Sequence, residues 1–152
     1  MNRLVLPAAL VLAAACGGGR SAPAGSDAGP PVLSPNDVVS QFMQAVADSN
    51  LTRMGQLWGT ARGSAAVVGE PVRWREHVAV MQLYLRGGSS RVVSNMPGTG
   101  PGERRQLTLE LERGGCVKQV PFTVLRLQDS SWLVVNVDIN QAGNPARPCG
   151  VT

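Results

Sequence analysis

Residues 107–139, LTLELERGGCVKQVPFTVLRLQDSSWLVVNVDI, decide the fold because apolar and polar side chains alternate along them between short turns. Leucine occupies every second position from residue 107 to residue 111, which is the pattern of a strand with one buried face. Gly114-Gly115 and Asp129-Ser130-Ser131 are turn sequences that divide the stretch into three strands. With a shorter strand candidate at residues 91–95, the sequence predicts a meander of about four antiparallel strands.

The last two strands carry more specific predictions. In residues 116–128 the apolar positions change from one face to the other, and a β-bulge near Val124-Leu125 would explain the change. The final strand has one wholly apolar face, which should meet the helices: Leu133, Val135, Val137 and Ile139. Its other face, which begins with Trp132 and Val134, then points away from the helices and is a candidate surface for a homodimer.

The segment before the strands has helical periodicity. Ser34-Pro35-Asn36-Asp37 has the side chains of a helix N-terminus with a capping box, and apolar residues at helical spacing follow to about residue 48. A short second helix ends before residues 59–72, which we expect to form a loop with one helical turn or a short strand. A third helix begins near Trp74 and ends at Gly87-Gly88.

Three helices followed by about four antiparallel strands define an α+β fold. Over residues 34–140 the chain resembles the nuclear transport factor 2-like (cystatin-like) fold, and more closely the small exported lipoproteins that carry it. The resemblance rests on the order of the elements and on three features: Val38-Val39-x-x-Phe42-x-x-Ala45, Leu57-Trp58 and Trp132-Leu133-Val134-Val135. It implies that the three helices pack on the concave face of a curved sheet and leave a cone-shaped pocket. These are structural positions, so the resemblance says little about function.

The N-terminus predicts export. Asn2-Arg3 is a short basic head, and residues 4–12 are an apolar run too short to remain in a bilayer as a spanning helix. Ala13-Ala14-Ala15-Cys16 then resembles the cleavage site of a bacterial lipoprotein signal, although that family prefers leucine three residues before the cysteine. The resemblance implies that residues 1–15 are removed as a signal peptide and that Cys16 carries the lipid. The alternative is an ordinary secretory signal cut before the cysteine, which would leave a free thiol at the N-terminus of an exported protein.

The mature chain divides into a tether and one domain. Residues 16–33 begin with the lipidated Cys16 and are otherwise mostly Gly, Ala, Ser and Pro, which predicts a flexible tether. Residues 34–152 are long enough for a single domain. Gly17 follows the cysteine where an aspartate would mark the inner membrane in the lipoproteins it resembles. We therefore expect a lipid-anchored protein of the cell envelope, attached to the outer membrane and facing the periplasm.

The number of cysteines also favours an exported protein. The chain has three, and once Cys16 is assigned to lipid, Cys116 and Cys149 form an even pair that we expect to be a disulfide. Two unpaired thiols in a reducing cytosol are the alternative. Two distant cysteines and His77 provide too few ligands for a metal site, and no metal is expected.

Composition and motifs argue against several classes of function. The net charge is +4, but the basic residues are scattered and aromatic residues make up only 4% of the chain, so a nucleic-acid partner is not expected. The sequence contains no phosphate-binding loop and no G-x-S-x-G, H-E-x-x-H or C-x-x-C motif. We expect no cofactor.

The candidate pocket residues are Trp74, His77 and Tyr84 of the third helix. Some relatives of the fold that the chain resembles use an Asp–Tyr or His–Asp pair in the cone, and Asp138 is an available acid. The alternation of the last strand turns Asp138 away from the cone, so we assign no catalytic residue. The first hypothesis is a non-catalytic domain that binds a small apolar ligand or an envelope protein. The alternative is a pocket enzyme of the isomerase or hydratase type on the same fold.

Overall fold

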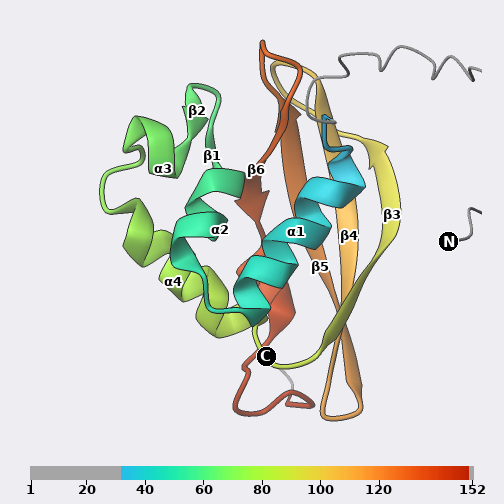
Figure 1. Cartoon of the computed structure of the whole chain (residues 1–152). Coiled ribbons are helices and arrows are strands. Elements are labelled where there is room, and N and C mark those ends of the chain that lie inside the picture. Colours follow the sequence, from blue (N-terminus) through green and yellow to red (C-terminus); the bar gives the residue numbers. More distant parts are fainter. Residues whose placement is uncertain (1–31, 151–152) are drawn as a thin grey trace, which may run out of the picture. The chain divides into compact units, whose positions relative to one another are not determined.

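The computed structural model describes residues 32–150 and contains a group of helices followed by an antiparallel sheet (Figure 1). This order confirms the α+β class that the sequence predicts. The predicted signal peptide at residues 1–15, the lipidation site Cys16 and the tether up to residue 31 lie outside the described residues. Within residues 32–150, no helix has the length and hydropathy needed to cross a membrane.

The first part of the described chain is mainly helical. Its elements are α1 (Pro35–Ala47), α2 (Leu51–Leu57), β1 (Gly59–Thr60), β2 (Gly63–Ser64), α3 (Ala65–Val68) and α4 (Trp74–Leu85). The three predicted helices correspond to α1, α2 and α4, and the segment between α2 and α4 contains both a helical turn and a short strand pair. The predicted capping box begins α1. Ser34 Oγ accepts a hydrogen bond from the Asp37 backbone N–H (3.2 Å), and the Asp37 carboxylate accepts one from the Ser34 backbone N–H (3.1 Å).

The second part is a sheet of four antiparallel strands in the order β3-β4-β5-β6. The strands are β3 (Ser89–Pro97), β4 (Arg104–Arg113), β5 (Cys116–Arg126) and β6 (Trp132–Val137), and a 3₁₀ helix, η1 (Ile139–Ala142), follows them. β3 is longer than the segment at residues 91–95 that its sequence predicts. In Figure 1, α1 crosses one face of the sheet, and α2 and α4 lie beside α1 on the β6 side.

Apolar side chains fill the space between α1 and the sheet. Phe42 of α1 and Phe122 of β5 are both fully buried, and their rings meet edge to face with centroids 6.1 Å apart. The leucines at positions 107, 109 and 111 of β4 are at most 1% exposed, which confirms their period of two. The face of the sheet toward the helices is therefore the main core of the domain.

The predicted orientation of the last strand is wrong at its beginning. Thr123 pairs with Asn136, but the next residue of β5, Val124, pairs with Val134, so Val135 is an extra residue and β6 contains a bulge. The bulge lies close to the predicted place, but on β6 rather than on β5. It reverses the alternation, because a shift of one residue moves every preceding side chain to the opposite face.

This reversal changes which residues are available for contacts. Val134 is fully buried in the core, and Trp132 packs against the core cluster, so both residues lie on the face of the sheet that meets the helices. Leu133 pairs with Leu125 on the opposite face of the sheet. Val137 still faces the core, as predicted. The predicted outward orientation of Trp132 and Val134 is therefore wrong, and these two residues do not provide a surface for a homodimer.

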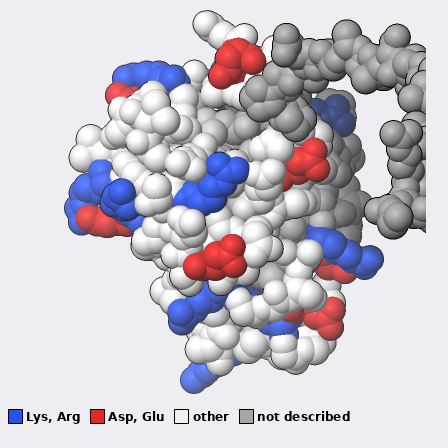
Figure 2. All heavy atoms as spheres, viewed as in Figure 1, with Lys and Arg blue, Asp and Glu red and all other residues white. Residues whose placement is uncertain are grey.

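On the face drawn in Figure 2, basic and acidic side chains alternate, and no broad area of one sign is visible. Several of the exposed charges are paired, including Arg62 with Glu70 (2.6 Å) and Arg91 with Glu110 (2.7 Å). Such exposed pairs contribute little to stability because water screens them.

Candidate functional site

The cone expected between helices and sheet is occupied by the protein's own side chains. Trp74 lies so close to Gly55 of α2 that a Cβ added at Gly55 would overlap the indole ring. Met81 packs against the core, and Phe122 is fully buried. The candidate pocket residue Trp74 is therefore part of the packing between α2 and α4, and it does not face an open cone.

The second candidate residue, His77, lies at a separate and shallow hollow. Its ring stacks on Trp58, with centroids 5.9 Å apart and planes 23° apart, and the residue is exposed. The hollow has a volume of about 300 Å³ and is lined by Glu76, His77, Val80, Met81, Val137 and Ile139. Tyr84 does not reach it, so the histidine and the tyrosine of α4 do not converge on one site.

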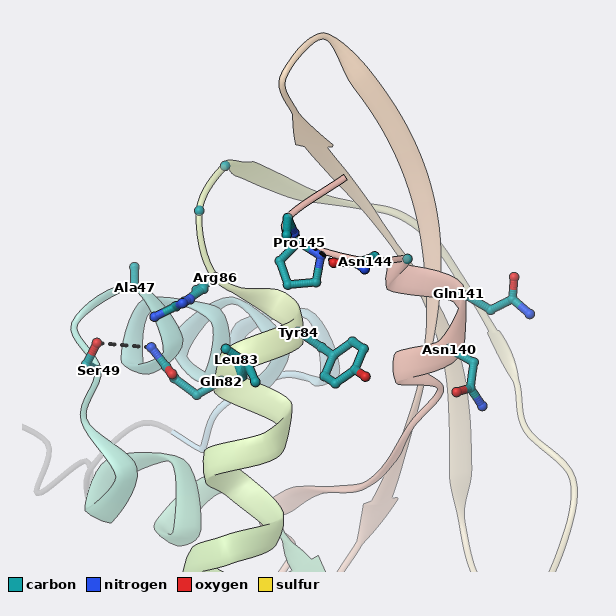
Figure 3. Close-up of a pocket in the computed structure, with 14 residues that line it drawn as sticks. Ala47, Ser49, Gln82, Leu83, Tyr84, Arg86, Asn140, Gln141, Asn144 and Pro145 are labelled. Atoms are coloured by element: carbon teal, nitrogen blue, oxygen red, sulfur yellow. Dashed lines mark hydrogen bonds between the residues drawn. The ribbon is translucent and has the colours of Figure 1, made fainter. Parts of the chain in front are cut away.

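A groove lies at the C-terminal end of α4. Its volume is about 1,100 Å³. Three segments that are distant in the sequence form it: the end of α1, the end of α4 with the turn that follows, and η1 with the chain after it (Figure 3). Its lining consists of Ala47, Ser49, Gln82, Leu83, Tyr84, Arg86, Gly87, Gly88, Asn140, Gln141, Gly143, Asn144, Pro145 and Ala146. We call this hollow the α4 groove.

The last turn of α4 presents different side chains to the two sides of the groove. Gln82 and Arg86 are four residues apart and extend to the same side, toward α1, where the Gln82 amide donates a hydrogen bond to Ser49 Oγ (3.1 Å; Figure 3). Tyr84 extends to the other side, toward η1 and Asn140 (Figure 3). The side chains thus provide amides, hydroxyls and a guanidinium, all of which donate hydrogen bonds.

A buried arginine supports the wall of the groove. Arg113, at the end of β4, is only 5% exposed, and its guanidinium donates to the carbonyl oxygens of Tyr84 (2.8 Å), Arg86 (3.4 Å) and Ala142. It therefore ties the end of α4 and the end of η1 to the sheet. Burial lowers the pKa of Arg113 from its ordinary value, because removal from water disfavours the charged form.

Close backbone contact brings the end of α4 onto the sheet. Gly88, which follows α4, lies so near β4 that a Cβ there would overlap the Glu112 carbonyl oxygen and come within 2.5 Å of the Arg113 side chain. Gly87 has φ +77°, a conformation that other residues rarely adopt. The Gly87-Gly88 pair predicted as a helix stop therefore also allows the groove to form where it does.

A disulfide holds the opposite wall. Cys116, at the start of β5, is joined to Cys149, with Cα atoms 5.4 Å apart. This is the pairing expected from the sequence, and it fixes the chain after η1, whose residues 143–146 line the groove. Two ties, one covalent and one through Arg113, thus keep this irregular segment against the sheet.

The sequence identified one of the groove residues and missed the others. Of Trp74, His77 and Tyr84, only Tyr84 lines the groove. Asn140 and Asn144 lie after the last strand, and nothing local in the sequence indicates that this segment folds back beside α4. Arg113 did carry a signal, because it continues the buried face of β4 two residues after the last leucine.

The α4 groove contains the chemistry of a binding site and lacks a paired acid and base. Among the described residues that line it there is no carboxylate and no imidazole. Residues 32–150 also contain no group of three or more His, Cys, Asp or Glu side chains arranged to hold a metal ion. Comparison of the chain with known protein families, with characterised proteins and with solved structures found no match.

Proposed function

We propose that this chain is a lipid-anchored protein of the bacterial cell envelope whose single domain binds a small ligand without catalysing a reaction. The anchor is a lipid on Cys16 after removal of residues 1–15. The domain at residues 34–152 is nuclear transport factor 2-like, and the anchor holds it at the outer membrane on the periplasmic side. The ligand site is the α4 groove.

The cysteines support the anchor. With Cys116 and Cys149 joined to each other, Cys16 is the one cysteine of three that the disulfide leaves over. A stable disulfide is typical of an exported protein, in agreement with the apolar segment that precedes Cys16. A lipid on Cys16 accounts for that segment and for the odd cysteine together.

The order of the elements supports the fold proposal. Helices come first, a meander of four antiparallel strands follows, and α1 packs across one face of the sheet. In this domain the interior between α1 and the sheet is filled, so an apolar ligand in a central cone has no room. We therefore replace the apolar ligand expected from the sequence with a polar one bound in the α4 groove.

The observation that carries the binding proposal is the combination of size and lining in the α4 groove. A volume of about 1,100 Å³ is at the large end of ligand sites in proteins. Tyr84 and Leu83 offer apolar surface, while Gln82 and Asn144 offer hydrogen bonds. The isomerase or hydratase alternative needs a positioned acid and base, and His77 and Tyr84 open into different hollows.

Partitioning between detergent and water tests the anchor. The native protein should enter the detergent phase of a cloud-point separation, and the Cys16→Ser variant should remain in the aqueous phase because it cannot carry the lipid. Cys149→Ser is the matched control, since it removes a different cysteine and should leave the protein in detergent. A native protein that stays in water, or a Cys16→Ser variant that still enters detergent, would contradict the proposal.

A further inference from the structure

One cation lines the α4 groove, and two more lie next to residues that line it. Arg86 lines the groove, and Arg113 lies behind its wall, bonded to the carbonyl oxygens of the lining residues Tyr84 and Arg86. Lys118 is the third cation, because a Cβ added to the lining residue Gly143 would lie 3.4 Å from Lys118 Cε and 4.0 Å from its Nζ. Arg86 directly follows α4, Arg113 ends β4, and Lys118 belongs to β5.

Few negative groups oppose them. None of the described residues that line the groove is Asp or Glu. Asp48 lies between the lining residues Ala47 and Ser49, and its carboxylate accepts hydrogen bonds from the Gln44 amide at 3.0 and 3.1 Å, so it is the nearest acidic side chain in the sequence to the groove. The C-terminal ends of α1 and α4 do bring partial negative charge to the groove, about half an elementary charge each.

The positive charge of these cations is larger than the partial negative charge of the two helix ends. Arg113 binds the free carbonyl oxygens at the end of α4 directly, so it neutralises much of that helix's contribution. No carboxylate among residues 32–150 forms an ion pair with Arg113, and at 5% exposure water screens its charge poorly. Arg86 and Lys118 then add two further positive charges near a surface that carries no acid of its own.

We propose that the α4 groove selects a small organic anion whose carboxylate is bound by Arg86 and whose apolar part packs on the lining side chains. This inference rests on the proposed function, in which the groove is the ligand site. Arg86 is exposed and provides a planar fork of donors that matches a carboxylate. The hydrogen bond between Gln82 and Ser49 holds the neighbouring wall in place, so the site is formed before the ligand arrives.

Benzoate and benzamide form a matched pair of probes, since they have the same size and ring and differ in charge. Each is titrated into the full chain carrying Cys16→Ser, which removes the anchor and leaves every described residue intact, and backbone amide shifts are followed by NMR. Benzoate should shift the amides of Arg86, Gly87, Gly143 and Asn144 and should bind more tightly than benzamide. Added NaCl should weaken benzoate binding and leave benzamide binding unchanged.

Two arginine variants, each of which removes one positive charge from the protein, test whether Arg86 binds the carboxylate. Arg86→Gln should weaken benzoate binding about fivefold, the size expected for one charge-assisted contact in an exposed groove. Arg75→Gln lies on the same helix, about 16 Å away along its axis, and should leave binding unchanged. Lys118→Gln should weaken benzoate binding and not benzamide binding.

The outcomes separate this inference from the proposal on which it rests. If benzoate and benzamide shift the groove amides equally, the groove remains a ligand site and its selection of anions is wrong. If neither probe shifts those amides, or if the shifts lie elsewhere in the domain, both the inference and the proposed ligand site are wrong.

Discussion

Replacing Cys116 and Cys149 together by serine should destabilise the domain by about 3.7 kcal/mol. The two residues are 33 positions apart, which fixes the length of the loop that the disulfide closes. Closing such a loop removes about 12.5 cal/mol/K of chain entropy from the unfolded state, which is about 3.7 kcal/mol at room temperature. This amount is a large fraction of the total stability of an ordinary domain, so the variant should be close to unfolding.

Urea denaturation followed by tryptophan fluorescence measures the loss. Both proteins carry Cys16→Ser, so neither lipid nor a third thiol contributes. The parent protein treated with a reductant is the matched control, and it should unfold at the same urea concentration as the variant lacking both cysteines. A loss below about 1 kcal/mol would refute the reasoning from chain entropy. A parent protein whose stability does not change on reduction would show that the Cys116–Cys149 bond does not form in solution.

Two further predictions concern the core and the first helix. Phe122→Ala should destabilise the domain by about 3–5 kcal/mol in the same urea assay, because it removes a fully buried ring and its contact with Phe42; a loss under about 1 kcal/mol would contradict a filled interior. Ser34→Ala should raise the pKa of Asp37 toward its ordinary value of 3.8, because the Ser34 side chain is the main group that lowers it, and an NMR titration of the carboxyl carbon measures the change. Since the folded pKa of Asp37 is the depressed one, the capping interaction stabilises α1 above pH 3.8 and is lost as the pH falls through the lower folded value. The stability difference between the parent and the Ser34→Ala variant should therefore become smaller in acid, where the hydrogen bond from the Asp37 backbone N–H to Ser34 Oγ remains, and an Asp37 pKa that the substitution leaves unchanged would contradict the assigned hydrogen bonds.

Local signals were enough to predict most of the elements. The capping box at Ser34 and Asp37 involves residues three apart, and the leucines of β4 are spaced by two, so both patterns can be read without knowing the fold. The glycines at 87 and 88 end a helix for a local reason as well. The element order, and with it the α+β class, follows from such signals.

The orientation of the last strand depended on pairing instead. The bulge at Val135 exists because β6 must pair with β5 on both sides of it, and no residue in the β6 sequence marks that position. Reading strict alternation through the strand therefore placed Val134 outside, although it is fully buried. The same error produced the mistaken dimer surface.

The candidate site was the least predictable part of the molecule. The α4 groove combines residues from near position 47, from 82–88 and from 140–146, and only the folded chain brings them together. Tyr84 is predicted from its place on a flank of α4, but Asn140 and Asn144, which also line the groove, are polar residues in a segment without regular strand structure. Their position follows from the disulfide at Cys149 and from the hydrogen bonds of Arg113.

The most direct test of the proposed function is the intact mass of the protein purified from the membranes of cells that express it. We expect a chain that begins at Cys16, lacks residues 1–15, carries a diacylglyceryl group and is lighter by the two hydrogens lost in the Cys116–Cys149 bond. A chain that retains Met1, or one that begins at Cys16 with an unmodified thiol, would contradict the lipid anchor.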